Sequence, residues 1–380
     1  MAQQPLNQEE VVLGEEIGNV RLITLNKPHQ LNVISSEVVA LLAKYLEKWE
    51  KDDAAKLVIF KGNGRAFSAG GDLKMFYEHR SDDTCLEVVY RMYWLCNHIH
   101  TYKKTTVALV HGIVMGGGGA LVVPSNFSVV TENAVFAMPE VAVGLHTDCS
   151  FSYILPRLPG YLGEYLGLTG ARLKGKEIVA AGLATHFVPS DKLSELEKRL
   201  LSLSSGEDST VRATIEEFSL DAKPDEQSIL NKLSAIDRCF CGESVEDIIK
   251  LLEEETGREG NEWIASTIKT LKRSSPTSLK ITLRSIREGR KQNLAECLKK
   301  EFRLTMNILR SVTSGDCYEG MRAYIEKDNS PKWNPPSLEE VSSEMIDQVL
   351  KPFSTELELQ VPSEEARWDG KYEDTVYNKH

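Results

Sequence analysis

The strongest constraint on this fold is the alternation of two hydrophobic patterns between Val20 and about Gly175. Short runs rich in β-branched and large apolar residues are typical of largely buried strands. Between them lie segments in which apolar residues recur at helical spacing, the first of which follows Ser36, a good N-cap candidate. The alternation predicts βα units rather than a sandwich or barrel of hairpins. The predicted strands cover residues 20–25, 56–60, 106–110 and 127–130.

After about Ser190 the strand pattern ends and the chain becomes helical. The segment 244–247 resembles a capping box, and Ser275 with Pro276 supplies an N-cap and a first helical residue. We therefore expect an α/β core over residues 1–200 and a helical C-terminal region over 201–350. Residues 351–380 form a polar, acidic tail that we expect to be loosely held.

The composition excludes several classes of protein. The 380 residues include 45 Lys and Arg against 56 Asp and Glu, a net charge of −11, which argues against a general nucleic-acid binder. The longest apolar stretch, 106–124, is interrupted by His111 and by four consecutive glycines, so no membrane-spanning helix is predicted.

The cysteines and the two termini give little sign of metal binding or targeting. Seven cysteines without a C-x-x-C pair favour ordinary packing in a reducing compartment, and no metal site is predicted. The first eleven residues contain neither arginine nor an apolar run, so we predict no secretory signal or transit peptide there. The last three residues share only a central basic residue with the peroxisomal address.

Two glycine-rich segments each follow a predicted strand. Residues 62–72 form a dense run of small residues, and residues 115–120 contain four glycines before a predicted short helix at 120–123. Such loops let backbone N–H groups face a ligand without obstruction by a Cβ atom. Two N–H groups at the ends of neighbouring strands are what an oxyanion hole requires. The alternative is structural, because close packing of a helix against a sheet also favours glycine.

Two carboxylates follow within the segment 136–148. Glu140 lies between Pro139 and the apolar residues 141–143, so we expect it to be desolvated and its pKa to be raised toward the range useful for acid–base catalysis. Asp148 comes eight residues later.

Together these segments resemble the crotonase, or enoyl-CoA hydratase/isomerase, superfamily. The resemblance rests on four motifs in the family's order, which is more specific than any single glycine loop. It implies an α/β fold with a crotonase-type ββα spiral core and a C-terminal helical region, and it implies binding of acyl-CoA thioesters. The motifs are residues 26–32, 66–72, 111–118 and 136–140.

The resemblance also implies roles for individual residues. The N–H groups of Gly71 and Gly117 correspond to the oxyanion hole, Glu140 to the catalytic glutamate, and Asp148 to an aspartate that contacts a substrate hydroxyl or orders water. Ala120 stands where hydratases carry a second glutamate, which disfavours hydration. Glu78 is either a substrate contact or part of a charged helix surface. The positions expected to contact substrate are Gly70, Asp72, Glu78, Gly116, Leu31 and Arg65.

Further segments resemble the 3-hydroxyisobutyryl-CoA hydrolases, thioesterases of valine breakdown within this superfamily. They are residues 155–165, 168–175, 181–188, 275–283 and 328–334. The resemblance implies thioester hydrolysis without a separate cofactor, because coenzyme A is part of the substrate. The expected partner is a small acyl-CoA, with neither nucleic acid nor membrane; the sequence is compatible with a homo-oligomer. The family resemblance implies a peroxisomal or mitochondrial location. The lack of a clear targeting signal would instead imply a cytosolic one.

This chain departs from the family around the aspartate. Typical members read Phe-Pro-Asp-x-Gly, whereas residues 146–150 read His-Thr-Asp-Cys-Ser. Thr147 lacks the rigidity of proline, Ser150 lacks the backbone freedom of glycine, and His146 adds a titratable group. A non-catalytic acyl-CoA binder or assembly subunit is therefore the alternative hypothesis. A serine hydrolase is disfavoured because G-x-S-x-G is absent, and nucleotide hydrolysis because Glu177 replaces the Ser or Thr of a P-loop.

Overall fold

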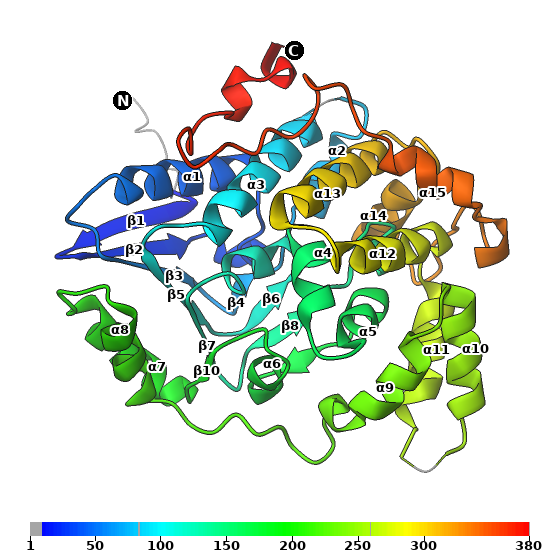
Figure 1. Cartoon of the computed structure of the whole chain (residues 1–380), viewed down its shortest axis with the longest axis horizontal. Coiled ribbons are helices and arrows are strands. Elements are labelled where there is room, and N and C mark those ends of the chain that lie inside the picture. The colour runs from blue at the N-terminus through cyan, green and yellow to red at the C-terminus, as the bar shows by residue number, and fades with distance from the viewer. Residues whose placement is uncertain (1–9, 83, 259, 380) are drawn as a thin grey trace, which may run out of the picture.

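The computed structural model describes residues 10–379 apart from 83 and 259. The segment before residue 10, and with it most of the stretch examined for targeting signals, lies outside the described residues, as does His380. Two sheets form the centre of the molecule, with helices around them (Figure 1).

The larger sheet has the strand order β1-β2-β3-β5-β7-β10. β1 and β2 form an antiparallel hairpin, and each later pair is parallel. Strands β2, β3, β5 and β7 confirm the four strands predicted from the sequence. The bounds are β1 (Val12–Ile17), β2 (Val20–Leu25), β3 (Leu57–Gly62), β5 (Thr105–Val110), β7 (Phe127–Val130) and β10 (His186–Phe187).

The smaller sheet has the order β4-β6-β8-β9, with β4, β6 and β8 parallel. Each of these three short strands directly follows a strand of the larger sheet and precedes a helical segment, so the chain repeats a ββα unit. This repetition confirms the crotonase-type fold class. The bounds are β4 (Ala66–Ser68), β6 (Ile113–Met115), β8 (Val135–Ala137) and β9 (Leu173–Lys174).

The helices of the core follow the predicted pattern, with two corrections. α1 begins at Ser36, and its N-cap is Ser35, whose side chain accepts a hydrogen bond from Val38 N; the prediction of Ser36 as N-cap was wrong by one residue. The predicted helix at 120–123 is also wrong, because a 3₁₀ helix, η2, begins earlier and includes the glycines themselves. The bounds are α1 (Ser36–Glu50), α2 (Leu73–Glu78), α3 (Thr84–His100), η1 (Pro28–Gln30), η2 (Gly116–Leu121), η3 (Glu140–Val143), α4 (Phe151–Ile154), η4 (Leu155–Arg157), α5 (Leu162–Thr169), α6 (Lys176–Ala180) and α7 (Ser190–Leu201).

The C-terminal half is helical, as predicted, and both predicted starts are confirmed: Ser244 and Asp247 form a capping box, and Ser275 caps α12 ahead of Pro276. α13 packs along α3 of the core. The division of the chain at residues 200 and 350 stays a prediction; α8, beyond the first boundary, packs with α7 against the larger sheet. The bounds are α8 (Asp208–Glu216), η5 (Ile229–Lys232), α9 (Leu233–Phe240), α10 (Val245–Glu255), α11 (Trp263–Arg273), α12 (Pro276–Gly289), α13 (Leu294–Leu309), α14 (Asp316–Glu326), η6 (Leu338–Glu340), α15 (Ser343–Leu350), η7 (Tyr372–Asp374) and η8 (Val376–Lys379).

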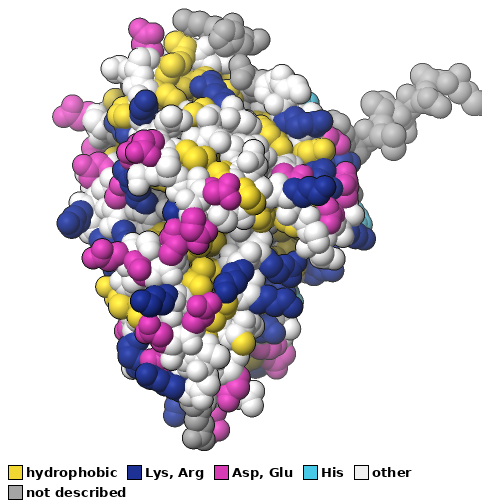
Figure 2. Space-filling view, turned by 90° about the vertical axis from the view of Figure 1, so that its right-hand side faces the viewer, with side chains coloured by type: hydrophobic (Ala, Val, Ile, Leu, Met, Phe, Trp, Pro, Cys, Tyr) yellow, Lys and Arg dark blue, Asp and Glu magenta, His cyan; other side chains and the backbone are white. Residues whose placement is uncertain are grey.

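One face of the molecule is mixed in charge. Figure 2 shows Lys and Arg side chains interspersed with Asp and Glu on one face, an arrangement that lets opposite charges pair across it. Over the described residues, no helix combines the length and the apolar character that crossing a bilayer requires.

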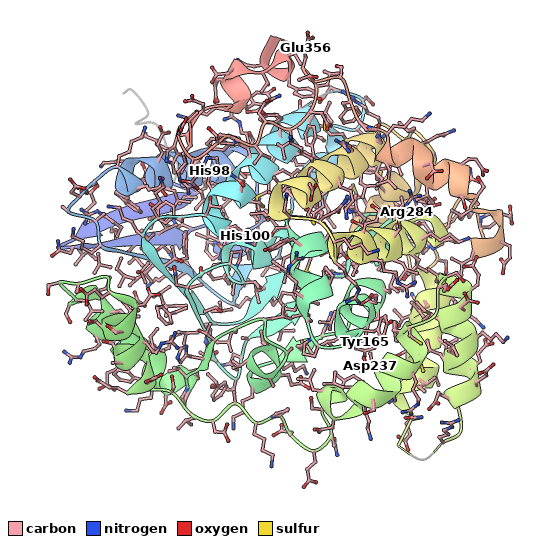
Figure 3. All side chains as sticks on the ribbon, viewed as in Figure 1. His98, His100, Tyr165, Asp237, Arg284 and Glu356 are labelled. Atoms are coloured by element: carbon pink, nitrogen blue, oxygen red, sulfur yellow. The ribbon has the colours of Figure 1, made fainter. Side chains whose placement is uncertain are left out.

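The expectation of a loosely held tail is wrong. Arg367 forms a buried ion pair with Glu50, at 2.7 Å, and Trp368 is 8% exposed. His98 of α3 (Figure 3) lies 2.5 Å from the carbonyl oxygen of Arg367 and stacks near the Trp368 ring. Arg367 and Trp368 therefore anchor this polar segment on α1 and α3, because their contacts outweigh the polar average composition of the tail.

Candidate functional site

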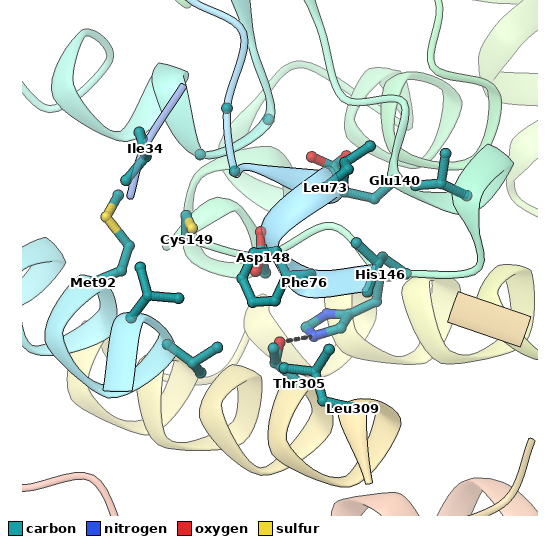
Figure 4. A pocket seen from close by; sticks show the side chains of 18 of the residues that line it. Ile34, Leu73, Phe76, Met92, Glu140, His146, Asp148, Cys149, Thr305 and Leu309 are labelled. Atoms are coloured by element: carbon teal, nitrogen blue, oxygen red, sulfur yellow. Dashed lines mark hydrogen bonds between the residues drawn. The ribbon is translucent and has the colours of Figure 1, made fainter. Parts of the chain in front are cut away.

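A largely apolar pocket lies where the strand-end loops of the smaller sheet face α3, α13 and α14 (Figure 4). Two groups of residues line it. The first, which we name the strand-end loops, comprises Gly70, Gly71, Gly116, Gly117 and Glu140. The second, the helical wall, comprises Tyr93 of α3, Thr305 and Leu309 of α13, and Met321 of α14. Asp148 and His146 lie between the two groups.

The two glycine loops converge. Gly70 has a φ of +89°, and a Cβ atom there would lie 3.4 Å from Gly117 N. Within the described part of the chain, the Gly71 N–H donates no hydrogen bond, and Gly117 stands in the first turn of η2, where N–H groups lack helical partners. Two backbone donors therefore border one pocket, an arrangement that can stabilise an oxyanion.

Glu140 opens η3 directly after Pro139 and is only 7% exposed. Its Oε2 atom is buried and has no hydrogen-bond partner among the described residues. Burial, and then the charge of Asp148, raises its pKa well above the ordinary value of 4.5. The predicted desolvation is therefore confirmed. The carboxyl also lies against the glycine loop, because a Cβ atom on Gly116 would be 2.7 Å from Glu140 Oε1.

Asp148 is held from the helical side. The Tyr93 hydroxyl is hydrogen-bonded to Asp148 Oδ2 at 2.6 Å, while burial raises the pKa of this carboxyl. Cys149 and Ser150, which follow it, have φ values of 54° and 75°, a conformation that favours glycine. The backbone N–H of Ser150 donates to Glu301 of α13 at 2.7 Å, so the helical region holds the strained turn in place.

Four residues expected to contact substrate do not line the pocket. Leu31 accepts a backbone hydrogen bond from Ala69 and only supports the loop. Asp72 caps α2 through Met75 N, and Arg65 is exposed. Glu78 pairs with Lys74 at 3.6 Å and is 57% exposed, so its interpretation as a charged helix surface fits better. Gly70 and Gly116, in contrast, do line the pocket.

The helical wall was not predicted from the sequence. Tyr93 lies in a helix whose residues are mostly buried, and Thr305 comes from an amphipathic helix more than 200 residues later, so neither stands out by spacing. The departure at His146 was the only signal in the sequence that pointed to this side of the pocket. Among the described residues, no group of three or more His, Cys, Asp or Glu could hold a metal ion.

Comparison with known proteins decides the family. The family model described as enoyl-CoA hydratase/isomerase matches residues 20–350. The chain belongs to the enoyl-CoA hydratase/isomerase family. This confirms the resemblance inferred from the four motifs, whose ordered spacing spans the strand-end loops.

Relatives within the enoyl-CoA hydratase/isomerase family bear hydrolase names. The chain is 65% identical to 3-hydroxyisobutyryl-CoA hydrolase-like protein 5 of Arabidopsis thaliana over 99% of both chains. It is 42% identical to 3-hydroxyisobutyryl-CoA hydrolase 1 of the same plant, over 95% of this chain and 97% of the other. The resemblance to this group of the family is thus confirmed over almost the whole length.

A solved structure confirms the fold of this family member. The crystal structure of a carnitinyl-CoA dehydratase from Mycobacterium thermoresistibile aligns with a TM-score of 0.85 and 33% sequence identity. The alignment covers 94% of this chain and 100% of the other, so it includes the helical C-terminal half as well as the ββα core.

Proposed function

We propose that this protein is an acyl-CoA thioester hydrolase that converts 3-hydroxyisobutyryl-CoA and water into 3-hydroxyisobutyrate and coenzyme A in valine catabolism. The observation that carries the proposal is the buried Glu140 carboxyl, with an unpartnered oxygen, beside the N–H donors of two glycine loops. The hydrolase names of full-length relatives support the same reaction.

The strand-end loops can stabilise the negative charge that develops on the carbonyl oxygen during thioester hydrolysis. The carbonyl oxygen gains negative charge on attack, and the N–H groups of Gly71 and Gly117 are available to it. Removing one such donor typically costs roughly 2.7–4 kcal/mol of barrier. The coenzyme A thiolate leaves without a strong acid, so a second carboxylate at position 120 is not needed.

Glu140 has two chemically consistent roles. It attacks the carbonyl carbon to give an anhydride that water then hydrolyses, or it removes a proton from the attacking water. In both cases a desolvated carboxylate with a raised pKa is more basic and more nucleophilic than one in water.

Asp148 and the apolar lining favour a short acyl chain with a hydroxyl group. Asp148 is the carboxyl that faces the strand-end loops from the helical side, and much of the remaining lining, such as Leu73, Phe76 and Met92, is apolar. It can accept a hydrogen bond from a 3-hydroxyl or from the attacking water. We propose no separate cofactor, because the coenzyme arrives as part of the substrate; a homo-oligomer stays a prediction.

Free-thiol release from a panel of acyl-CoAs tests this function. The panel includes 3-hydroxyisobutyryl-CoA, isobutyryl-CoA and acetyl-CoA, with hydration of crotonyl-CoA measured in parallel. We expect wild type to hydrolyse the hydroxylated substrate best and Glu140→Ala to be inactive. Glu254→Ala, which removes an exposed carboxyl on α10, serves as the matched control. Rapid crotonyl-CoA hydration with little thiol release would overturn the proposal.

A non-catalytic acyl-CoA binder is the second candidate, favoured by the strained, non-glycine turn at Cys149 and Ser150. Isothermal titration with coenzyme A separates the two functions. Binding without thiol release from any member of the panel would favour the binder.

A further inference from the structure

A continuous chain of short hydrogen bonds runs from Asp148 along the helical wall of the pocket. Asp148 Oδ2 lies 2.6 Å from the Tyr93 hydroxyl, which lies 2.7 Å from Thr305 Oγ1. Thr305 Oγ1 in turn lies 2.7 Å from His146 Nε2, the contact drawn in Figure 4. The other ring nitrogen, His146 Nδ1, faces the Thr147 carbonyl oxygen at 3.2 Å. Tyr93 and His146 are each 1% exposed, so bulk water does not replace these contacts.

The number of available hydrogen atoms restricts which group donates in each of these three hydrogen bonds. Three links need one hydrogen each, yet the hydroxyls of Tyr93 and Thr305 supply only two. The third hydrogen comes either from His146 Nε2, in which case all donors point toward Asp148, or from Asp148 Oδ2, in which case all donors point toward His146. Since Nδ1 faces a carbonyl acceptor, it carries a hydrogen in both arrangements.

The two arrangements contain the same number of protons. One is a carboxylate with an imidazolium, and the other is a carboxylic acid with a neutral imidazole. They interconvert when Asp148 Oδ2–H gives its proton to Tyr93, the Tyr93 proton moves to Thr305, and the Thr305 proton moves to His146 Nε2. Three O–H bonds break, two O–H bonds and one N–H bond form, and no external reactant is consumed.

We propose that Tyr93, Thr305 and His146 are positioning residues that form a proton relay for Asp148 and store on His146 the proton displaced when Asp148 activates water. This inference rests on the proposed hydrolase function. The relay belongs to the route in which Glu140 is the nucleophile: as water attacks the acyl carbon of the anhydride, its proton passes to Asp148 Oδ1, while the Oδ2 proton moves along the relay. The positive charge that forms on His146 accompanies the negative charge that forms at the oxyanion hole. As the tetrahedral intermediate collapses, Asp148 Oδ1 gives the proton taken from water to the departing group. The reverse shift then returns the His146 proton to Asp148 Oδ2, which restores the resting state.

The surroundings favour the uncharged arrangement at rest. Burial lowers the pKa of His146 to about 3 and raises the pKa of Asp148. The carboxyls of Glu140 and Glu301 and the Cys149 thiol surround Asp148, while the Lys300 ammonium disfavours a charge on His146. A positive charge therefore forms on His146 only when negative charge develops on the substrate.

Isosteric variants of the two hydroxyl residues test the relay. We expect Thr305→Val and Tyr93→Phe each to lower kcat for thioester hydrolysis by about 10²-fold, the usual scale of proton-transfer catalysis, with KM nearly unchanged. Because either variant breaks the same relay, the double variant should be no slower than each single one. Thr305→Ser, which keeps the hydroxyl, should restore most of the rate. Thr282→Val is the matched control, since it removes another buried hydroxyl, one that has no hydrogen-bond partner among the described residues.

Two outcomes would overturn the relay: kcat of Thr305→Val equal to that of the Thr282→Val control, or losses from Thr305→Val and Tyr93→Phe that multiply in the double variant. A ¹⁵N spectrum of the histidine-labelled full chain gives a readout that does not depend on turnover. The relay predicts that His146 carries its proton on Nδ1 and accepts at Nε2, and that Thr305→Val alters the Nε2 resonance. A proton on Nε2 at rest would contradict it. If wild type released no thiol but the predicted tautomer were found, the hydrolase proposal would fail while the hydrogen-bond arrangement remained.

Discussion

The two sides of the pocket are built by different means. The strand-end loops come from three successive ββα units, and each places a short local segment at the end of a short strand. The helical wall comes from helices far apart in the chain, and Thr305 reaches Asp148 only through Tyr93, 212 residues away. The loops offer backbone donors and an unpartnered carboxyl, whereas the wall offers side chains already hydrogen-bonded to one another. The strand-end loops are therefore suited to act on substrate. The helical wall is suited to adjust the protonation of the groups that act on it.

The largest effect is expected from crowding the strand-end loops. Gly116 has a φ of +50°, and a Cβ atom there would lie 2.7 Å from Glu140 Oε1. Gly116→Ala should therefore displace both the donor loop and the carboxyl, and lower kcat/KM for thiol release by about 10²–10³-fold. Gly257→Ala is the matched control, because that glycine also has a positive φ, of +91°, but no atom within 4 Å of its Cβ position. Equal activity of the two variants would remove the loops from the mechanism.

A somewhat smaller effect is expected from the group that joins the two sides. Asp148→Asn should lower kcat by about 10²-fold for both acetyl-CoA and 3-hydroxyisobutyryl-CoA, because the water proton loses its acceptor. Asp237→Asn serves as control, since Asp237 accepts a hydrogen bond from Tyr161 N and does not line the pocket. A loss confined to the hydroxylated substrate would show that Asp148 binds the 3-hydroxyl and does not handle the water proton.

The burial of Glu140 should be visible in protein stability. Between pH 4.5 and its folded pKa this carboxyl is ionised in the unfolded chain but protonated in the folded chain, because burial raises its folded pKa. The free energy of unfolding therefore falls as the pH rises from 4.5 toward the folded pKa. Glu140→Gln should raise that free energy by about 1 kcal/mol at pH 7. Well below pH 4.5 the gain should vanish, because both side chains are then neutral. Urea unfolding at both pH values measures the difference, and a gain independent of pH would contradict the desolvated carboxyl.

The smallest effect on activity is expected at position 120. Ala120 is 1% exposed and belongs to the core rather than to the pocket lining. Ala120→Glu should therefore confer no measurable crotonyl-CoA hydration, because a carboxyl alone does not supply the water-positioning geometry. The absorbance of the enoyl thioester follows the reaction. A gain of hydration would show that only one carboxyl separates this site from a hydratase.

The sequence predicted the parts of this molecule that depend on local pattern. The buried strands, the caps at Ser244 and Ser275, and the converging glycines follow from short-range propensities and from four ordered motifs. Local pattern did not decide whether Glu78 contacts substrate or belongs to a charged helix surface; its side chain is 57% exposed at the end of α2. The 3₁₀ helix η2 was missed because four glycines give no helical pattern by which to place its start.

The contacts of the wall and the tail depend on tertiary packing. Tyr93 and Thr305 meet only because α13 packs along α3, and no spacing in the sequence encodes that crossing. The tail was misjudged for the same reason: its composition is polar, yet Arg367 and Trp368 both bind the buried Glu50. In both the wall and the tail, a few specific side-chain contacts decide the structure, and neither local spacing nor average composition reveals them.

One comparison of rates tests the account most directly. Thiol release from 3-hydroxyisobutyryl-CoA is measured for wild type, Glu140→Gln and Thr305→Val under the same conditions, with coenzyme A binding measured for each. The account predicts that all three bind coenzyme A, that Thr305→Val retains a reduced but measurable rate, and that Glu140→Gln retains none. A Glu140→Gln protein as fast as Thr305→Val or faster would contradict it, because the chemistry would then not depend on the strand-end loops.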